Sequence, residues 1–205
     1  MLIRYMCDRI GIATLAGLDV LDLGCGVRFS QSIINRNVAI GTYTGLETEK
    51  EIVDYLRANV TDPRLCYHHV NTLNAYYNPR GQKLDARSPS PLGRRYDVAC
   101  MFSVITHQQP EEAISIFHFL RRHIRPSGHL FFSAFIHDDN VIYKERDPKN
   151  PGHRSSYSLA YMTKILADTD WSVRTVAKPR PNGIPIQSSF LCRPRPRPDF
   201  TSCNL

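Results

Sequence analysis

The sequence predicts an α/β fold in which a doubly wound, mostly parallel seven-stranded sheet forms the middle layer of a three-layer sandwich. Two observations support this prediction. Apolar segments of strand length alternate with segments of helical periodicity along most of the chain. The last two strand-like segments, 171–176 and 187–192, have no helical segment between them, which indicates a C-terminal antiparallel hairpin.

The predicted elements follow one another in a regular order. The remaining strands are predicted at 19–23, 43–46, 65–70, 97–102 and 130–135. Helices are predicted at 1–12, after Gly26, after Thr48, from Pro110 and around Met162. Thr48 and Glu51 have the spacing of a capping box for the third helix. Pro110 opens the fourth helix, at a position where its missing N–H costs no hydrogen bond.

The chain of 205 residues has the length of one domain, and we predict that residues 1–192 form it. Two polar segments that contain Pro and Gly, 76–95 and 137–156, interrupt the pattern. We interpret them as insertions that cover a substrate. Residues 193–205 form a basic, Pro-rich tail that we expect to be disordered because it cannot pack a core.

The net charge of +7 is concentrated in two segments, 76–95 with +4 and 174–205 with +5, so the rest of the chain carries −2. Basic segments occur in enzymes that act on nucleic acids. No aromatic residues alternate with the basic ones here, and a solvated loop and tail is the favoured interpretation.

Composition also excludes several classes. None of the six cysteines has Cys-x-x-Cys spacing, so neither a metal site nor disulfides are predicted. No apolar run approaches the roughly 18 residues that a membrane span needs. The N-terminus lacks the pattern of a signal peptide. We therefore expect a cytoplasmic protein that does not associate with membranes.

A glycine loop follows the first predicted strand. Gly24 and Gly26 lie at the carboxyl end of that strand, where open α/β sheets bind ligands. A dinucleotide site needs a third glycine, but Phe29 stands at that position, which disfavours a nicotinamide dehydrogenase. Glu47 ends the second strand, and its carboxylate can accept hydrogen bonds from both hydroxyls of a ribose. These residues predict a nucleoside ligand without a diphosphate.

Four motifs resemble those of class I methyltransferases that use S-adenosylmethionine (SAM). Val20 to Gly26 (VLDLGCG) is similar to motif I, and Tyr43 to Glu47 (YTGLE) to the second motif. Tyr96 to His107 (YDVACMFSVITH) resembles the fourth strand and its exit. Leu120 to Phe132 (LRRHIRPSGHLFF) resembles the helix, turn and strand that follow. The resemblance covers residues 19–192 and implies SAM as cofactor.

The resemblance implies a role for each residue of the first motif. Asp22 would organise the glycine loop and receive the amino group of the cofactor. Gly24, Cys25 and Gly26 would line its methionine part. Val27 departs from the family, which often has a further glycine close behind the loop.

The resemblance extends to the following strand ends. Glu47 would hold the ribose hydroxyls, and Asn71, where the family often has an acidic residue, would face the adenine amine. Phe102 and Ser103 would contact the methionine part through their backbone.

The resemblance implies methyl transfer to an oxygen or nitrogen atom of a small-molecule acceptor. His107 follows the fourth strand, and His137 and Asp138 follow the fifth, so each is a candidate general base. Tyr143 and Tyr157 are candidates for lining the acceptor pocket.

Two alternatives remain open. One is a non-catalytic module that binds SAM or a partner, because only 18 residues precede the first strand and Arg28 follows the glycine loop. The other is an RNA or DNA methyltransferase, which the basic segments alone suggest.

Overall fold

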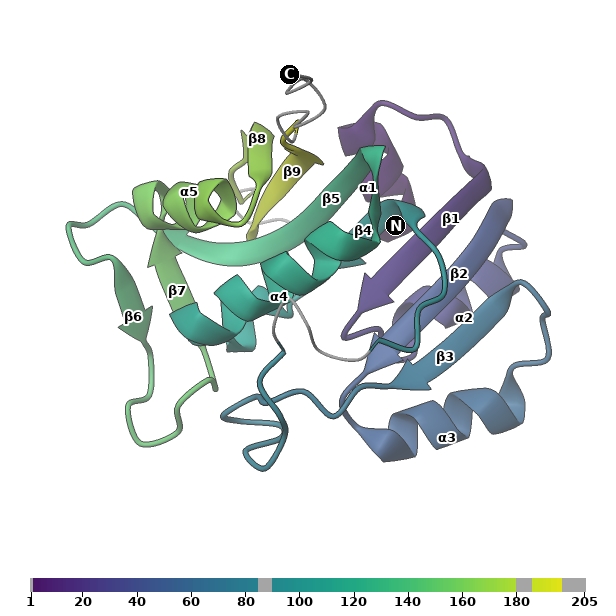
Figure 1. Cartoon of the computed structure of the whole chain (residues 1–205), viewed down its shortest axis with the longest axis horizontal. Coiled ribbons are helices and arrows are strands. Elements are labelled where there is room, and N and C mark those ends of the chain that lie inside the picture. Colours follow the sequence, from purple (N-terminus) through teal and green to yellow (C-terminus); the bar gives the residue numbers. More distant parts are fainter. Residues whose placement is uncertain (1, 85–89, 180–185, 197–205) are drawn as a thin grey trace, which may run out of the picture.

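A computed structural model of the chain describes residues 2–84, 90–179 and 186–196. The helices are α1 (Leu2–Ile10), α2 (Arg28–Asn35), α3 (Lys50–Asn59), α4 (Pro110–His123) and α5 (Leu159–Asp168), with a short 3-10 helix η1 (Ile105–His107). The strands are β1 (Leu15–Leu23), β2 (Ile40–Glu47), β3 (Leu65–His69), β4 (Tyr96–Met101), β5 (Ile124–His137), β6 (Tyr143–Glu145), β7 (Ser155–Ser158), β8 (Trp171–Ala177) and β9 (Ser188–Pro194). Figure 1 shows α4 in front of the sheet and α2 behind it.

The strands form one mixed sheet. Its order is β3-β2-β1-β4-β5, with parallel pairing throughout this part. β9 then pairs antiparallel with both β5 and β8, which confirms the predicted hairpin. Because the order reverses between β1 and β4, the loops at the carboxyl ends of these two strands diverge and leave room for a ligand.

Two apolar clusters cover the two faces of the sheet, which confirms the three-layer sandwich. Neighbouring residues of β1 point to opposite faces, as the pleat requires. Val20 belongs to the cluster formed with α1, α2 and α3, whereas Leu21 belongs to the cluster formed with α4 and α5. The fully buried Trp171 fills the second cluster and donates its indole N–H to the carbonyl oxygen of Phe117 at 3.1 Å.

The sheet extends further than the sequence predicted. Segment 137–156 was expected to be irregular, but it contains β6 and the start of β7, so the described residues form nine strands instead of seven. β7 pairs parallel with the last residues of β5, from Phe135 to His137. Arg193 and Pro194, expected in the disordered tail, belong to β9. Residues 197–205 of that tail lie outside the described residues.

The predicted capping box at the third helix is also wrong. The N-cap of α3 is Glu49, and no side chain caps the helix. The hydroxyl of Thr48 instead donates to the carbonyl oxygen of Thr72 at 3.3 Å, which ties the end of β2 to the segment after β3. No helix among the described residues is long and apolar enough to cross a membrane.

Candidate active site

The glycine loop after β1 is held against the end of β2. The N–H groups of Gly24 and Cys25 donate to the carbonyl oxygen of Leu46 at 2.8 and 3.1 Å. Gly24 has φ +70°, and a Cβ added there would lie 2.5 Å from Cγ2 of Val104. The loop therefore requires glycine for both its backbone conformation and its close approach to the segment after β4.

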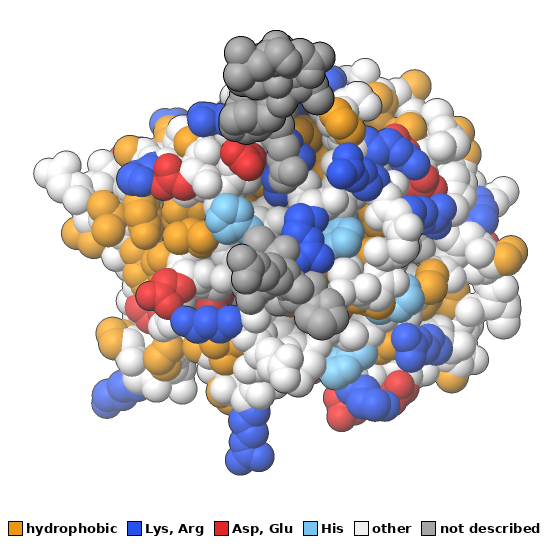
Figure 2. Space-filling model, in the orientation of Figure 1, with side chains coloured by type: hydrophobic (Ala, Val, Ile, Leu, Met, Phe, Trp, Pro, Cys, Tyr) orange, Lys and Arg blue, Asp and Glu red, His pale blue; other side chains and the backbone are white. Residues whose placement is uncertain are grey.

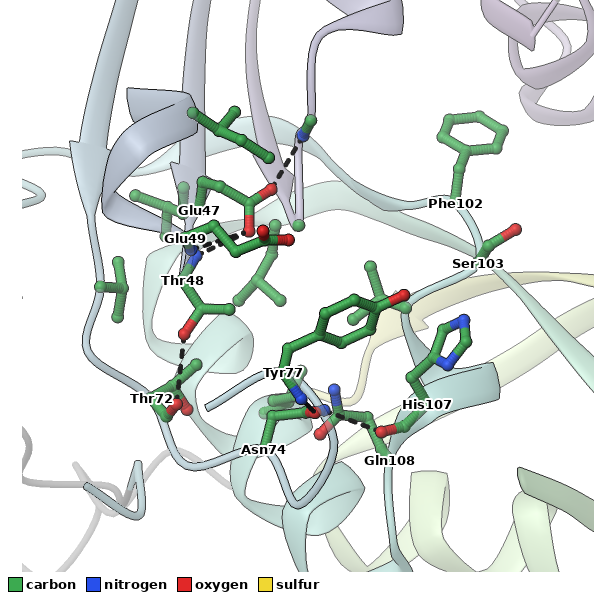
Figure 3. Close-up of a pocket in the computed structure, with 18 residues that line it drawn as sticks. Glu47, Thr48, Glu49, Thr72, Asn74, Tyr77, Phe102, Ser103, His107 and Gln108 are labelled. Atoms are coloured by element: carbon green, nitrogen blue, oxygen red, sulfur yellow. Dashed lines mark hydrogen bonds between the residues drawn. The ribbon is translucent and has the colours of Figure 1, made fainter. Parts of the chain in front are cut away.

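Glu47 connects this loop to β2. Its Oε2 accepts a hydrogen bond from the N–H of Gly26 at 2.9 Å, and its Oε1 accepts from the N–H groups of Thr48 and Glu49 at 2.7 and 3.3 Å. The side chain is buried but lines a cavity (Figure 3). Backbone donors thus fix a negative charge where the sequence predicted a receptor for ribose hydroxyls.

The cavity has a volume of about 270 Å³ and lies at the carboxyl ends of the parallel strands. Gly24 and Gly26, Leu46 to Glu49 and Phe102 to Val104 line it on the side of β1, β2 and β4. Its remaining lining residues are Leu23, Ile52, Val70, Thr72, Asn74, Tyr77, His107, Gln108 and Ile116. Five of the predicted cofactor residues therefore meet at one cavity: Gly24, Gly26, Glu47, Phe102 and Ser103.

Three other predicted cofactor residues do not line the cavity. Asp22, near the end of β1, and Cys25, within the glycine loop, are both buried. Asn71 is exposed, and its Oδ1 accepts a hydrogen bond from the side-chain amide of Asn78 at 2.8 Å. The segment after β3 instead presents Thr72 and Asn74 to the cavity.

Asp22 is a buried carboxyl group under the loop. Its Oδ2 accepts a hydrogen bond from the hydroxyl of Tyr43 at 2.8 Å. Burial raises the pKa of Asp22 to about 7, and the charge of Glu47 adds to this effect while the bond from Tyr43 opposes it. Burial also raises the pKa of the Cys25 thiol, with Asp22 and Glu47 adding to it, so this cysteine is an unreactive packing residue.

Ser103 shapes the wall that follows β4. Its φ of +59° is unusual for a residue with a side chain, and its N–H donates to the hydroxyl oxygen of Ser133 at 2.9 Å. The hydroxyl of Ser103 accepts a hydrogen bond from Nε2 of Gln187, also at 2.9 Å. Sequence reasoning missed Ser133 and Gln187, because they approach Ser103 only in the folded sheet.

His107 lies at the end of η1, on the opposite side of the cavity from Glu47 (Figure 3). Its Nδ1 is 3.1 Å from the carbonyl oxygen of Gly152. Burial lowers the pKa of His107 below 6.5, so the ring is neutral at neutral pH. A carbonyl oxygen can only accept, so Nδ1 donates to Gly152 and carries the proton, which leaves the lone pair of the neutral ring on Nε2.

Asn74 holds the neighbouring tyrosines beside this histidine. Its Nδ2 donates to the carbonyl oxygen of His107 at 2.8 Å, and its Oδ1 accepts from the N–H groups of Tyr76 and Tyr77 at 3.0 and 2.6 Å. The sequence instead suggested Tyr143 and Tyr157 as residues that line the acceptor pocket. Tyr157 is fully buried and donates to the carbonyl oxygen of Gln108 at 2.6 Å, so it does not face the cavity.

The other candidate bases lie elsewhere. β5 runs to His137, whose Nδ1 is 2.8 Å from Oδ1 of Asp139. Neither His137 nor Asp138 lines the cavity. Their role as general bases, expected from the sequence, therefore finds no support in the lining of this cavity. Among the described residues, no group of three or more His, Cys, Asp or Glu side chains is placed to hold a metal ion.

The sequence matches a known protein family and resembles a curated protein. Residues 3–176 match the family described as "Methyltransferase domain". A mitochondrial ubiquinone biosynthesis O-methyltransferase from Dictyostelium discoideum is 24% identical over 154 residues, which are 64% of this chain and 43% of that protein. The chain thus spans less than half the length of this curated relative.

Solved structures share the fold at low sequence identity. The glycopeptide N-methyltransferase MtfA complexed with SAM aligns with a TM-score of 0.65 and 13% identity, covering 95% of this chain and 92% of that one. A SAM-dependent methyltransferase from Mesorhizobium loti aligns with a TM-score of 0.64 and 13% identity, covering 93% and 97%. Magnesium protoporphyrin IX methyltransferase from Synechocystis, solved with SAM, aligns with a TM-score of 0.57 and 17% identity, covering 95% and 76%.

Proposed function

Because this chain belongs to the methyltransferase-domain family, we propose that it transfers a methyl group from SAM to an oxygen or nitrogen atom of a small molecule. Family membership supports the reaction and the methyl donor. The observation that supports the arrangement is a single cavity with the carboxylate of Glu47 on one side and the neutral imidazole of His107 on the other (Figure 3).

The residues around Glu47 fit the cofactor. Backbone N–H groups already fill three of the roughly four acceptor positions of the carboxylate, which leaves one position on Oε2 for a ribose hydroxyl. The apolar side chains of Leu46, Ile52 and Val70 line the same cavity, as a flat base requires. Gly26 has no heavy atom within 4 Å of an added Cβ, so the loop leaves open space beside it. SAM supplies a methyl group on a positively charged sulfur, which an acceptor lone pair attacks in line.

His107 is the proposed proton acceptor. Its neutral form and the lone pair on Nε2 are what a general base needs to take a proton from a hydroxyl or amine group near neutral pH. His137 lacks this position, since it does not line the cavity.

Segment 137–156, which we propose as part of the substrate cover, orients the imidazole of His107. Gly152 offers its carbonyl oxygen to Nδ1 of His107, and its N–H donates to Oε1 of Glu145 at 3.0 Å. The other oxygen of Glu145 accepts from the hydroxyl of Tyr143 at 2.5 Å. Glu145 is therefore a positioning residue, because it holds Gly152, which in turn orients the imidazole of His107.

A small acceptor agrees better with this site than a polynucleotide. The charged side chains that line the cavity are Glu47 and Glu49, which would repel phosphates. On the face shown in Figure 2, Lys and Arg side chains are spread among acidic and neutral ones instead of forming one band. A non-catalytic module would bind the same cofactor but would not convert any acceptor.

Calorimetric titration with S-adenosylhomocysteine (SAH) tests the cofactor site. Glu47→Gln removes one acceptor oxygen and places an amide N–H₂ against a backbone donor or a ribose hydroxyl. Charged hydrogen bonds contribute about 1.5–3 kcal/mol each, so we expect SAH to bind at least about tenfold more weakly.

Glu49→Gln is the matched control. Glu49 also lines the cavity, but its carboxylate accepts no hydrogen bond from the described residues, so the same change of charge is expected to alter SAH affinity less than threefold. No SAH binding by the folded wild type, or equal losses in both variants, would contradict the proposed cofactor site.

A further inference from the structure

Four aromatic rings gather on the outer side of the cavity. The ring of Tyr76 lies 4.9 Å from that of Tyr77, 6.2 Å from His107 and 5.1 Å from His153, measured between centroids. Tyr77 meets His107 edge-on at 5.2 Å. We call these four residues the aromatic cluster. It unites the two segments that the sequence marked as insertions, with His107 between them.

Backbone contacts hold the aromatic cluster in place. Asn74 fixes the N–H groups of both tyrosines and the carbonyl oxygen of His107. Gly152 has φ +78°, and a Cβ there would lie 3.2 Å from that same carbonyl oxygen and 3.4 Å from Tyr76. The two segments therefore approach each other too closely for a larger residue. The rings are arranged before any ligand arrives.

The tyrosines of the cluster are unusually open. Tyr76 and Tyr77 are 45% and 46% exposed, although large aromatic side chains normally bury most of their surface. Tyr77 and His107 also line the cavity. Exposed aromatic rings beside a cavity are typical of a surface that binds another flat, apolar group.

The charges around the cavity further limit which flat, apolar groups can bind beside it. Glu47 and Glu49 are the carboxylates of the lining, and no Lys or Arg lines the cavity within the described part of the chain. The pKa of Glu49 is raised by burial and by the nearby Glu47 and Glu51, which shows that negative charge already accumulates here. An acceptor with a carboxylate or phosphate would find no Lys or Arg among the lining residues to pair with.

We propose that the aromatic cluster is the acceptor subsite and that the acceptor is an uncharged aromatic ring that carries a hydroxyl group. This inference rests on the proposed function and specifies its substrate class. The acceptor O–H bond breaks, and its proton passes to Nε2 of His107. The oxygen bonds to the methyl carbon as the carbon–sulfur bond breaks, and sulfur keeps that electron pair.

Ligand-observed NMR with two matched probes tests the subsite. Catechol is an uncharged aromatic diol, and cyclohexane-1,2-diol has the same hydroxyls without the ring. We expect saturation transfer to catechol and at least fivefold weaker transfer to the cyclohexane diol, both with and without SAH. Equal transfer to both probes, or no transfer to catechol, would overturn the proposal.

Variants test whether catechol binds at the aromatic cluster. The double change Tyr76→Leu and Tyr77→Leu keeps apolar bulk but removes both rings, and we expect catechol affinity to fall about tenfold. Tyr55→Leu is the matched control, because Tyr55 is 56% exposed on α3, outside the cluster and the cavity lining. Catechol affinity that survives in the double variant, or falls equally in the control, contradicts the assignment.

A third probe tests the charge argument. 3,4-Dihydroxybenzoate adds a carboxylate to the catechol ring, and we expect it to bind at least fivefold more weakly than catechol. Equal or tighter binding would refute an uncharged acceptor. SAH binding is measured in the same samples. A lack of SAH binding would count against the proposed function, whereas the comparison of catechol with the other probes tests the acceptor subsite independently.

Discussion

The buried carboxyl group of Asp22 makes the stability of this fold depend on pH in an unusual direction. Most carboxyl groups stabilise a protein as they ionise, whereas burial raises the pKa of Asp22 from 3.8 to about 7. The folded state therefore holds this proton when the unfolded state has released it. The stability contribution of Asp22 is complete below about pH 4 and is lost as the pH rises to about 7.

The magnitude follows from the size of the pKa change. Each pH unit corresponds to about 1.4 kcal/mol, so a pKa raised from 3.8 to about 7 amounts to about 4 kcal/mol. Asp22→Asn cannot ionise, and its side-chain oxygen can still accept the hydrogen bond from Tyr43. The free energy of unfolding of the wild type minus that of the variant should fall by about 4 kcal/mol between pH 4 and pH 8.

Urea unfolding at several pH values measures this difference, and all other titrating groups cancel from it. Asp19 provides a control on the same strand. Burial raises the pKa of Asp19, but hydrogen bonds from Thr42 and Arg125 outweigh it and lower this pKa below its ordinary value. For Asp19→Asn, the difference in unfolding free energy should therefore change with pH in the opposite direction and only at acidic pH. A wild-type-minus-Asp22→Asn difference that stays flat from pH 4 to pH 8 would refute the reasoning.

Three further predictions concern the base and the loop. His107→Gln should lower kcat by about 10²–10⁴-fold while leaving SAH affinity within twofold. Wild-type kcat/KM should rise with pH through a midpoint below the ordinary histidine value, since burial lowers the pKa of His107 in the free protein. Steady-state kinetics across pH checks both points, and an unchanged kcat would remove His107 as the base. Glu145→Ala should lower kcat, and Glu145→Gln should restore part of it, because the amide oxygen can still accept from Gly152; equal losses in the two variants would argue against this positioning role. Gly24→Ala should cost more than about 1 kcal/mol of stability in thermal or urea unfolding, and Val104→Ala in the same chain should recover part of that loss by removing the contact with the added Cβ.

The donor side of the site could be predicted from sequence because its signals are local. Gly24 and Gly26 directly follow a strand, and Glu47 ends the next one, so each residue is placed by its own element. Parallel strands bring such ends to one edge of the sheet. The predicted meeting of these residues at one cavity agrees with their positions in the structure.

Apart from His107, the side of the cavity that we propose for the acceptor could not be predicted, because it depends on contacts between distant residues. Asn74 lies 33 residues before the histidine whose carbonyl oxygen it holds, and Gly152 lies 45 residues after that histidine. Neither residue belongs to a periodic pattern. β6 and β7 escaped prediction for a related reason, since they are only three and four residues long and contain several polar side chains. His137 was expected just past the fifth strand, but β5 continues two residues beyond its predicted end at Phe135 and includes this histidine.

The hydrogen bond between His107 and Gly152 links proton chemistry to the position of a loop. While the segment around Gly152 is docked, its carbonyl oxygen selects one tautomer of the imidazole. An imidazole without that partner shares its single proton between both nitrogens, and part of the population then presents an N–H to the acceptor instead of a lone pair. Loss of this contact would therefore leave only part of the imidazole population with its lone pair on Nε2, and the proposed base would be correspondingly less effective.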